Sequence, residues 1–158
     1  MGKQAKTNAV RILDSNKISY ELINYDSDGF MDGVSIADKL GQRVEETFKT
    51  LVTKGKSGNF FVFVIPVHKE LDLKAAAKSV SEKSVEMIAV ADINKVTGYI
   101  RGGCSPIGMK KQFMTVVDAS AEEFDKIMFS GGRLGTQIKM SPLELITLIG
   151  AKFENITI

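Results

Sequence analysis

Apolar and polar positions alternate with two different periods along this chain, and the changes of period divide it into short segments. Near the N-terminus apolar residues recur at helical spacing, where Ala5, Ala9, Ile12 and Leu13 predict one face of an amphipathic helix. The same reasoning predicts helices over residues 3–15, 34–40, 73–80, 92–96 and 142–150, with a helical turn over 120–123.

Runs rich in β-branched and aromatic residues occupy the intervals between these helices. Strands are predicted over residues 18–24, 47–53, 59–66, 85–87, 113–117, 126–129, 138–140 and 153–158. The glycine-containing segment 54–58 joins two of them and predicts a β-hairpin. Short strands interleaved with helices favour the α+β class, with a mixed and partly closed sheet.

Several residues at the segment boundaries are typical helix caps. Asp72 and Ser141 precede predicted helices as N-caps, and Ser35 is a candidate cap for the helix that Gly41 closes. The segment 120–123 carries a capping-box pattern. These local signals support the positions assigned to the helices.

The composition fits one globular domain spanning residues 1–158, because 44% of the 158 residues are apolar and 25% are charged. A net charge of +2 is too small to indicate nucleic-acid binding by itself, but it does not oppose a phosphate-bearing ligand. The single cysteine, Cys104, cannot form an intramolecular disulfide and fits a reducing cytosol. Neither a signal peptide nor a membrane-length apolar run is visible, so we expect a cytoplasmic protein without membrane attachment.

Few residues are available for metal, cofactor or nucleophilic chemistry. One cysteine and one histidine, His68, cannot complete a zinc site, and no phosphate-binding P-loop or dinucleotide fingerprint is present. We therefore expect no cofactor and no metal, with a carboxylate-only magnesium site left open. No Ser-His-Asp set or carboxylate pair is recognisable, so an enzyme of this kind would depend on positioning and on a reactive group of its substrate.

Two glycine-rich segments are candidate ligand-binding loops. The segment 98–111 contains four glycines, a Ser-Pro turn and the pair Lys110-Lys111, and its backbone N–H groups can surround an anion or oxyanion. The segment 130–135 is a second glycine-rich turn, in which Ser130 is placed either to contact a ligand or to cap the turn. Both segments also fit ordinary turns.

Isolated polar residues have a functional and a structural interpretation. Lys49 in the predicted strand either projects into a pocket to bind a phosphate or hydroxyl group, or lies in solvent at a sheet edge. Tyr25 begins a polar loop and either stacks on a base or half-buries at the loop edge. Cys104 as a nucleophile and His68 as a general base are weaker hypotheses, because a lone cysteine is more often a small buried apolar residue.

The segments 48–51 (Phe-Lys-Thr-Leu) and 102–111 (Gly-Gly-Cys-Ser-Pro-Ile-Gly-Met-Lys-Lys) carry a resemblance to a known family. Further matching segments are residues 71–74, 85–87, 97–99 and 129–132. The chain resembles the YbaK/EbsC family of bacterial aminoacyl-tRNA deacylases, relatives of the editing domain of prolyl-tRNA synthetase. The resemblance implies a mixed, partly closed, barrel-like sheet of six or seven strands with peripheral helices.

The resemblance also implies a function, which is trans-editing by removal of cysteine from mischarged Cys-tRNA(Pro), with prolyl-tRNA synthetase as a partner. In the mechanism proposed for the family, the thiol of the substrate attacks its own ester carbonyl and leaves as a cysteine thiolactone, so no protein nucleophile is needed. Two alternatives stay open. One is a deacylase for another small aminoacyl group, such as Ala-tRNA(Pro), and the other is a non-catalytic tRNA-binding or regulatory protein of the EbsC type.

By this resemblance the catalytic positions of the family fall on Lys49 and Gly102. The lysine would orient the phosphate or ribose hydroxyls of the terminal adenosine. The N–H groups of Gly102 and Gly103 would polarise the ester carbonyl.

The substrate-binding positions implied by the resemblance are Tyr25, Gly103, Ser130 and Gln137. Gln137 is a departure, because family members often carry aspartate in this segment. A neutral amide can hydrogen-bond to the α-ammonium group of the substrate but cannot pair with it as an anion.

Overall fold

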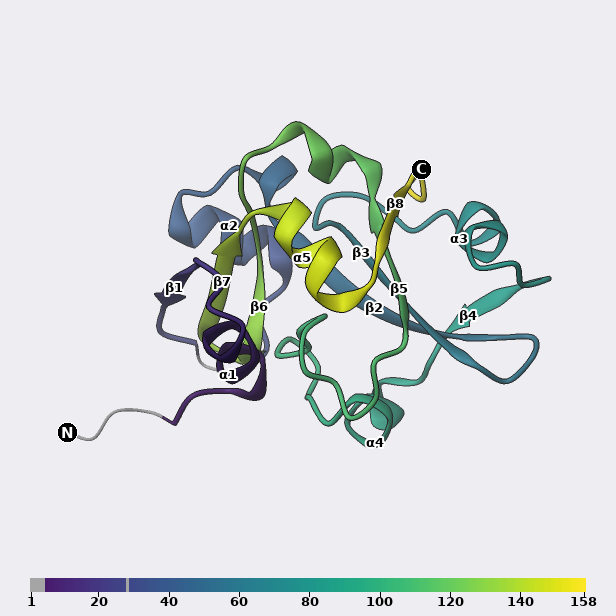
Figure 1. Cartoon of the computed structure of the whole chain (residues 1–158), viewed down its shortest axis with the longest axis horizontal. Coiled ribbons are helices and arrows are strands. Elements are labelled where there is room, and N and C mark those ends of the chain that lie inside the picture. The colour runs from purple at the N-terminus through teal and green to yellow at the C-terminus, as the bar shows by residue number, and fades with distance from the viewer. Residues whose placement is uncertain (1–4, 28) are drawn as a thin grey trace.

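The computed structural model describes residues 5–27 and 29–158 and is shown in Figure 1. Its α-helices are α1 (Asn8–Ser15), α2 (Gly33–Leu40), α3 (Leu73–Ser79), α4 (Ile93–Thr97) and α5 (Pro142–Ile149). Its strands are β1 (Glu21–Asn24), β2 (Phe48–Gly55), β3 (Phe60–Pro66), β4 (Val85–Met87), β5 (Met114–Asp118), β6 (Ile127–Arg133), β7 (Thr136–Met140) and β8 (Lys152–Glu154). Short 3₁₀ helices cover Val44–Glu46, Val90–Asp92 and Ala119–Glu123.

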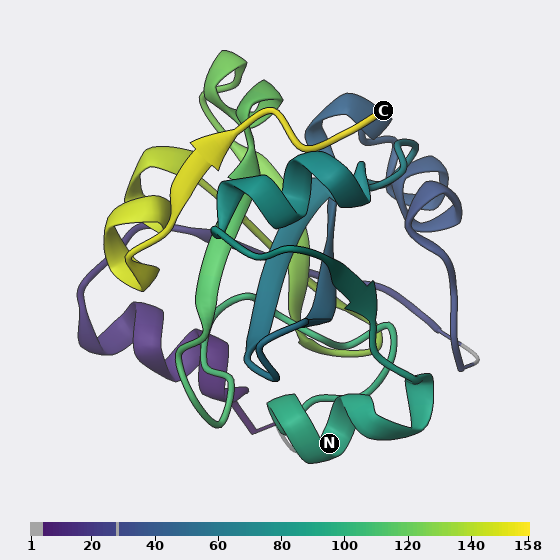
Figure 2. The same ribbon diagram turned by 90° about the vertical axis from the view of Figure 1, so that its right-hand side faces the viewer.

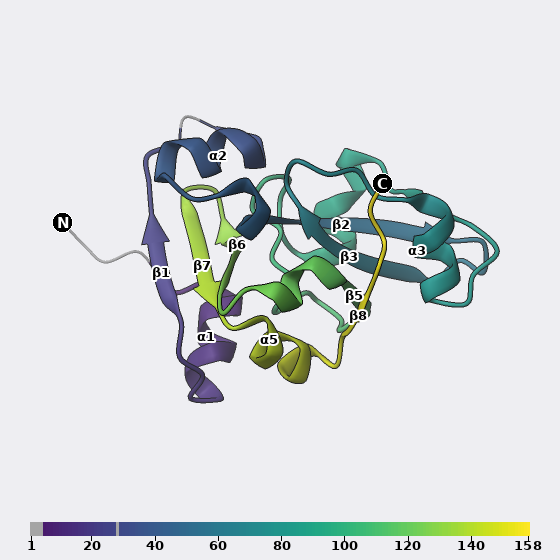
Figure 3. The ribbon, with the colours of Figure 1, turned by 90° about the horizontal axis from the view of Figure 1, so that it is seen from above.

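The strands form two sheets, which Figure 3 shows side by side. One sheet has five strands in the order β4-β2-β3-β5-β8, and the other has three in the order β1-β7-β6. The β2–β3 pair is the predicted antiparallel hairpin, whereas β3–β5 and β5–β8 are parallel. The predicted α+β class with mixed strand directions is therefore confirmed.

The expectation of one sheet with six or seven strands is wrong, because the described residues form eight strands in two sheets. The sheets meet at a single parallel bridge between Thr47 and Met128. Past this bridge β2 and β6 do not pair, and both line the cavity described below. No closed barrel is present among the described residues.

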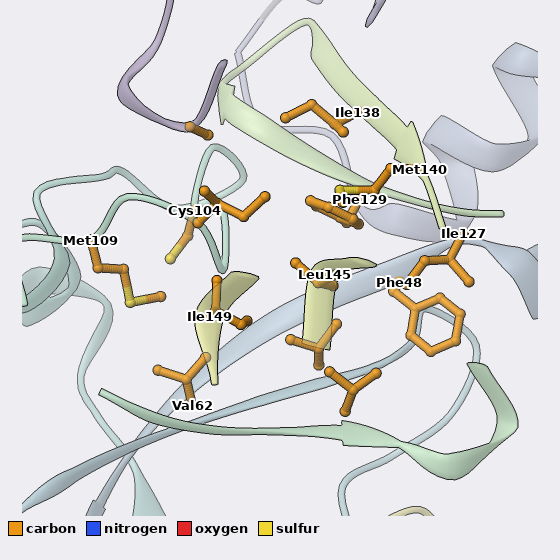
Figure 4. Close-up of a cluster of buried hydrophobic side chains, with 14 of the residues drawn as sticks. Phe48, Val62, Cys104, Met109, Ile127, Phe129, Ile138, Met140, Leu145 and Ile149 are labelled. Carbon is orange, nitrogen blue, oxygen red and sulfur yellow. The ribbon is translucent and has the colours of Figure 1, made fainter. Parts of the chain in front are cut away.

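The larger hydrophobic core is built from residues of both sheets together with α1 and α5 (Figure 4). On β3, Val62 and Val64 belong to this core, whereas Phe63 and Ile65 belong to a second core with residues of α3. All four side chains are fully buried. Figure 2 shows α3 lying across one face of the five-stranded sheet. Burial on both faces explains why the β3 segment is a continuous apolar run rather than an alternating one.

Local capping signals locate most helix ends correctly. The side chain of Asp72 accepts hydrogen bonds from the first turn of α3, and that of Ser141 does the same for α5. Gly41 closes α2 in the left-handed conformation at φ +65°. Ser35 is not a cap, because α2 begins earlier with Asp32 at its N-cap position.

Other element boundaries in the structure differ from the predicted ones. Thr7 caps α1, so the predicted helix over 3–15 begins only at Asn8, and its residues 3 and 4 lie outside the described residues. The predicted helical turn over 120–123 is a 3₁₀ helix whose cap is Asp118, not Ser120. The last strand, β8, is shorter than the predicted segment 153–158.

The predicted glycine turn over residues 130–135 is also wrong in part, because Ser130 to Arg133 belong to β6. The register of β6 against β7 shifts between Ser130 and Arg133, as in a β-bulge. A Cβ on Gly131 would lie 2.8 Å from the side chain of Thr136. Glycine therefore permits close strand pairing here, and the turn itself is restricted to the two residues before Thr136.

Candidate active site

A cavity of about 500 Å³ lies beside the unpaired part of β2. Separate segments of the chain line it, with Lys49 from β2, Gly102 from the loop after α4, Ser130 from β6 and Gln137 from β7. Further lining residues come from the segments 30–36, 87–93 and 101–104. The fold thus brings together four of the six residues that the family resemblance implies as catalytic or substrate-binding.

The cavity exists because β4 covers only one end of β2, from Thr53 to Gly55. The β2–β3 ladder has hydrogen bonds between Val67 and Thr47 and between Gly55 and Asn59. Because bonded and non-bonded pairs alternate in an antiparallel ladder, the backbone groups of Phe48 and Thr50 point away from β3. They lie along the strand edge that borders the cavity.

Lys49 is half-buried at the cavity wall. Burial lowers the pKa of its ammonium group below 10.5, while the carboxylates of Glu70 and Asp32 oppose this shift. Asp32 also lines the cavity, at the N-cap of α2. Among the described residues Lys49 forms no ion pair, so its ammonium group can meet an anionic or hydroxyl-bearing ligand.

Gly102 needs to be glycine for two reasons. Its φ of +81° is a conformation that residues with a Cβ adopt only at a cost. A Cβ would also lie 2.9 Å from the side chains of Leu134 and Phe30. The absence of a side chain therefore keeps the backbone at this position accessible at the cavity wall.

Gly103 differs from its neighbour and does not line the cavity. Its N–H already donates to the carbonyl oxygen of Ile100 at 2.9 Å. A Cβ on Gly103 would lie 2.9 Å from the backbone of Arg133. The expected pair of N–H donors is thereby reduced to Gly102, and Gly103 serves the packing of this loop against the end of β6.

Ser130 and Gln137 lie directly opposite each other on β6 and β7, so their side chains share one face. The Ser130 hydroxyl accepts a hydrogen bond from the N–H of Gly132 at 3.2 Å. Its own proton is thus directed elsewhere and can be donated to a ligand. Gln137 is 3% exposed, and this residue presents a neutral amide at the cavity.

Thr50 was not predicted to be a site residue, although it also lines the cavity. Its hydroxyl oxygen is buried and finds no hydrogen-bond partner among the described residues. An unsatisfied buried hydroxyl is unfavourable unless a ligand completes it. Only the tertiary structure reveals this, because threonine is an ordinary strand residue in the sequence.

Phe30 and Arg101 are two further residues at the cavity that the sequence patterns did not indicate. The guanidinium carbon of Arg101 lies 4.1 Å from the centroid of the Phe30 ring. Both residues are exposed. The signal that could have indicated Phe30 is an apolar aromatic residue inside an otherwise polar loop.

Tyr25 does not line the cavity. It is half-buried, and its backbone N–H donates to the carbonyl oxygen of Gly135 at 2.9 Å. His68 borders a different cavity with Asp118 and Ser120. Neither residue is placed by the fold among the residues that surround Lys49.

Cys104 lines the cavity as a buried residue. Burial raises the pKa of its thiol to about 11, so the thiol stays protonated at neutral pH. A protonated thiol is a poor nucleophile. The environment therefore favours the structural interpretation of this cysteine.

The described part of the chain contains no cluster of three histidine, cysteine or acidic side chains able to hold a metal ion. No helix in the same residues is long and apolar enough to cross a membrane. What the cavity offers is the ammonium group of Lys49, the guanidinium of Arg101, the carboxylate of Asp32, hydrogen-bonding groups and apolar walls. This combination can bind and orient a small polar ester but supplies no obvious nucleophile.

Residues 31–148 match the family described as the aminoacyl-tRNA editing domain. A protein of Enterococcus faecalis (strain ATCC 700802 / V583) is 43% identical over 155 residues, which cover 98% of this chain and 94% of the relative. That relative is named as a candidate Cys-tRNA(Pro)/Cys-tRNA(Cys) deacylase, EbsC. The resemblance drawn from the two sequence elements is confirmed.

Solved structures share this fold. A hypothetical protein superposes with a TM-score of 0.88 at 22% identity, over 96% of this chain and 99% of that one. A candidate trans-editing enzyme for prolyl-tRNA synthetase superposes with a TM-score of 0.84 at 20% identity, over 98% and 99% of the two chains. Because the family match spans residues 31–148 and the bacterial relative matches nearly the whole length, this chain belongs to the aminoacyl-tRNA editing domain family.

Proposed function

We propose that this protein is an aminoacyl-tRNA deacylase that removes cysteine from mischarged Cys-tRNA(Pro). The observation that carries the proposal is the convergence of Lys49, Gly102, Ser130 and Gln137 on one cavity. A volume of about 500 Å³ is in the range of small-molecule sites and suits the aminoacylated end of a tRNA. The name of the 43% identical relative supports cysteine as the amino acid removed.

The cavity favours a reaction in which the substrate supplies the nucleophile. Its one thiol, on Cys104, is held protonated by burial, and the only histidine, His68, borders another cavity. In the proposed step the cysteine sulfur of the substrate attacks its own ester carbonyl carbon. A carbon–sulfur bond forms, the carbon–oxygen ester bond breaks, and the thiol proton ends on the ribose oxygen of the tRNA, releasing a thiolactone.

The protein contributes orientation and electrostatic stabilisation to this step. The Lys49 ammonium holds the phosphate or ribose hydroxyls of the terminal adenosine, and the N–H of Gly102 polarises the ester carbonyl. The Ser130 hydroxyl and the amide of Gln137 hold the aminoacyl group from the paired strands β6 and β7. The unused hydroxyl of Thr50 supplies one more hydrogen bond to the substrate.

We place this activity in the cytoplasm, with prolyl-tRNA synthetase as the partner that selects the tRNA. A net charge of +2 gives little overall attraction to a polyanionic tRNA, and binding through phosphate contacts weakens steeply with salt. Addition of the synthetase is therefore expected to increase deacylation most at physiological salt. Equal rates with and without the synthetase at that salt concentration would argue against the partnership.

The experiment that tests the proposal compares purified protein on Cys-tRNA(Pro), Ala-tRNA(Pro) and Pro-tRNA(Pro). The expected result is rapid loss of cysteine only, and protection of the ester once the substrate thiol is alkylated with iodoacetamide. Loss of alanine instead would identify the other deacylase. Continued loss of the alkylated substrate would show attack by water, and survival of every ester would favour a binding protein without turnover.

A further inference from the structure

We propose that Phe30 and Arg101 form a stacking platform for the adenine base of the 3′-terminal nucleotide, an inference that rests on the proposed function. The two residues form a cation–π pair with 4.1 Å between the guanidinium carbon and the ring centroid. Both line the same cavity as Lys49. Phe30 is 52% exposed, so much of its surface remains available to a ligand.

The platform lies next to the group that would polarise the ester. A Cβ built on Gly102 would lie 2.9 Å from Cδ1 of Phe30, so the phenyl ring packs directly against the Gly102 backbone. The aminoacyl ester of the substrate is attached to the ribose of the terminal nucleotide. Its base must therefore lie within one nucleoside of the carbonyl held at Gly102, and this is where the ring and guanidinium are found.

The exposed apolar surface at this cavity is larger than a single ring. Met87 and Val90 also line the cavity, and they are 49% and 56% exposed. Exposed apolar side chains gathered around one cavity are typical of a binding site. A planar base with a polar edge fits them, because it can cover the apolar side chains while its edge stays in water.

The chemistry of the pair favours a nucleobase. Aromatic rings and guanidinium groups stack on every base, and this contact needs no hydrogen-bond partner on the base. Arg101 and Lys49 place two positive charges at this cavity against one carboxylate, that of Asp32, and the net positive charge complements the phosphate next to the terminal nucleoside. An apolar peptide would gain nothing from these charges.

The sequence offered Tyr25 as a candidate for base stacking, beside a structural interpretation in which it half-buries at the loop edge. That residue does not line the cavity, whereas Phe30 from the same loop does. Stacking on Phe30 therefore needs no rearrangement of the loop.

The test uses the variants Phe30→Ala, Phe30→Trp and Arg101→Ala in deacylation of Cys-tRNA(Pro). Loss of a stacked base is expected to lower kcat/KM by about 5- to 150-fold for Phe30→Ala, mainly through KM. Phe30→Trp should retain the wild-type value, because indole stacks at least as well. The matched control is Arg43→Ala, since Arg43 lies 5.9 Å from the ring of Phe124 and neither residue lines the cavity.

A binding measurement separates this inference from the proposed function. The chain has no tryptophan, so Phe30→Trp provides a single indole at the platform, whose emission can be excited apart from that of the three tyrosines. The trinucleotide CCA should quench its emission, and CC followed by an abasic sugar should not. Quenching without any deacylation by the wild type would support the platform and refute the proposed activity. Wild-type deacylation with unchanged kcat/KM in Phe30→Ala, or equal quenching by both trinucleotides, would overturn the platform alone.

Discussion

Replacement of Gly102 by alanine perturbs the cavity wall in a way that can be worked out from the structure. The residue has φ +81°, and a left-handed conformation costs an alanine about 1–2 kcal/mol. The new methyl group would also lie 2.9 Å from the side chains of Leu134 and Phe30. Both neighbours are flexible side chains, so we expect them to shift into the cavity rather than unfold the protein.

Gly58 provides the matched control for the backbone term. It has φ +94° in the β2–β3 turn, and a Cβ there meets no atom within 4 Å. Gly58→Ala and Gly102→Ala should therefore each lose about 1–2 kcal/mol of folding free energy, which is about 2–8 °C in Tm for a protein of this size. Only Gly102→Ala should lose deacylase activity, by about 10²-fold, because the ester carbonyl is displaced from its N–H donor.

The assay pairs urea unfolding with single-turnover deacylation of Cys-tRNA(Pro) at 25 °C, where both variants remain folded. Wild-type turnover by Gly102→Ala would refute the proposed position of the ester. An equal loss of activity in Gly58→Ala would show that general destabilisation, rather than the cavity wall, explains the effect.

Three further substitutions have definite expectations. Thr50→Val removes the unpartnered buried hydroxyl, so urea unfolding should show a gain of about 1 kcal/mol while kcat/KM falls; a loss of stability would mean that the hydroxyl is satisfied in the free protein. Lys49 has a lowered pKa, so the unfolded state binds more protons between the folded pKa and 10.5, and wild-type stability rises with pH across that window. Lys49→Met should therefore be more stable than the wild type at pH 7, with an advantage that narrows toward pH 10.5, and a constant difference in urea unfolding would contradict the burial effect. Cys104 is protonated and buried, so Cys104→Ser should keep its deacylase rate and the wild-type thiol should react slowly with iodoacetamide at pH 8; rapid alkylation would contradict the pKa of about 11.

Features set by neighbours in the sequence were predicted well. Asp72 and Ser141 cap their helices as expected, because a cap needs only the first turn that follows it. The hairpin of β2 and β3 was likewise encoded by two apolar runs and a glycine turn.

Features set by contacts between residues distant in the sequence were not predicted. Gly131 looked like a turn residue, yet it lies inside β6 because its close neighbour is Thr136 on the paired strand. Gly103 looked like an N–H donor, but Ile100 accepts its hydrogen bond and the backbone of Arg133 fills the space of its Cβ. A sequence pattern cannot distinguish a glycine required by a ligand from one required by packing.

The candidate site likewise combines features that the local sequence predicts with features that only the tertiary structure reveals. The sequence elements around Lys49 and Gly102 carried the family resemblance, but their meeting at one cavity depends on how β2 and β6 separate after the Thr47 bridge. Thr50 was missed because nothing in its local sequence distinguishes it, and Phe30 because its one signal, an aromatic residue in a polar loop, does not specify a ligand. An exposed ring becomes significant only beside Arg101, and a buried hydroxyl only when its lack of a partner is visible.

Deacylation of Cys-tRNA(Pro) by the wild type and by Lys49→Ala, measured side by side at equal protein concentration, is the sharpest test of the assigned active site. We expect rapid loss of cysteine with the wild type, and a rate with Lys49→Ala close to that of the ester in buffer. Equal rates for the two proteins would contradict the assignment of this cavity as the active site. Survival of the ester with both would contradict the catalytic function of the protein acting alone.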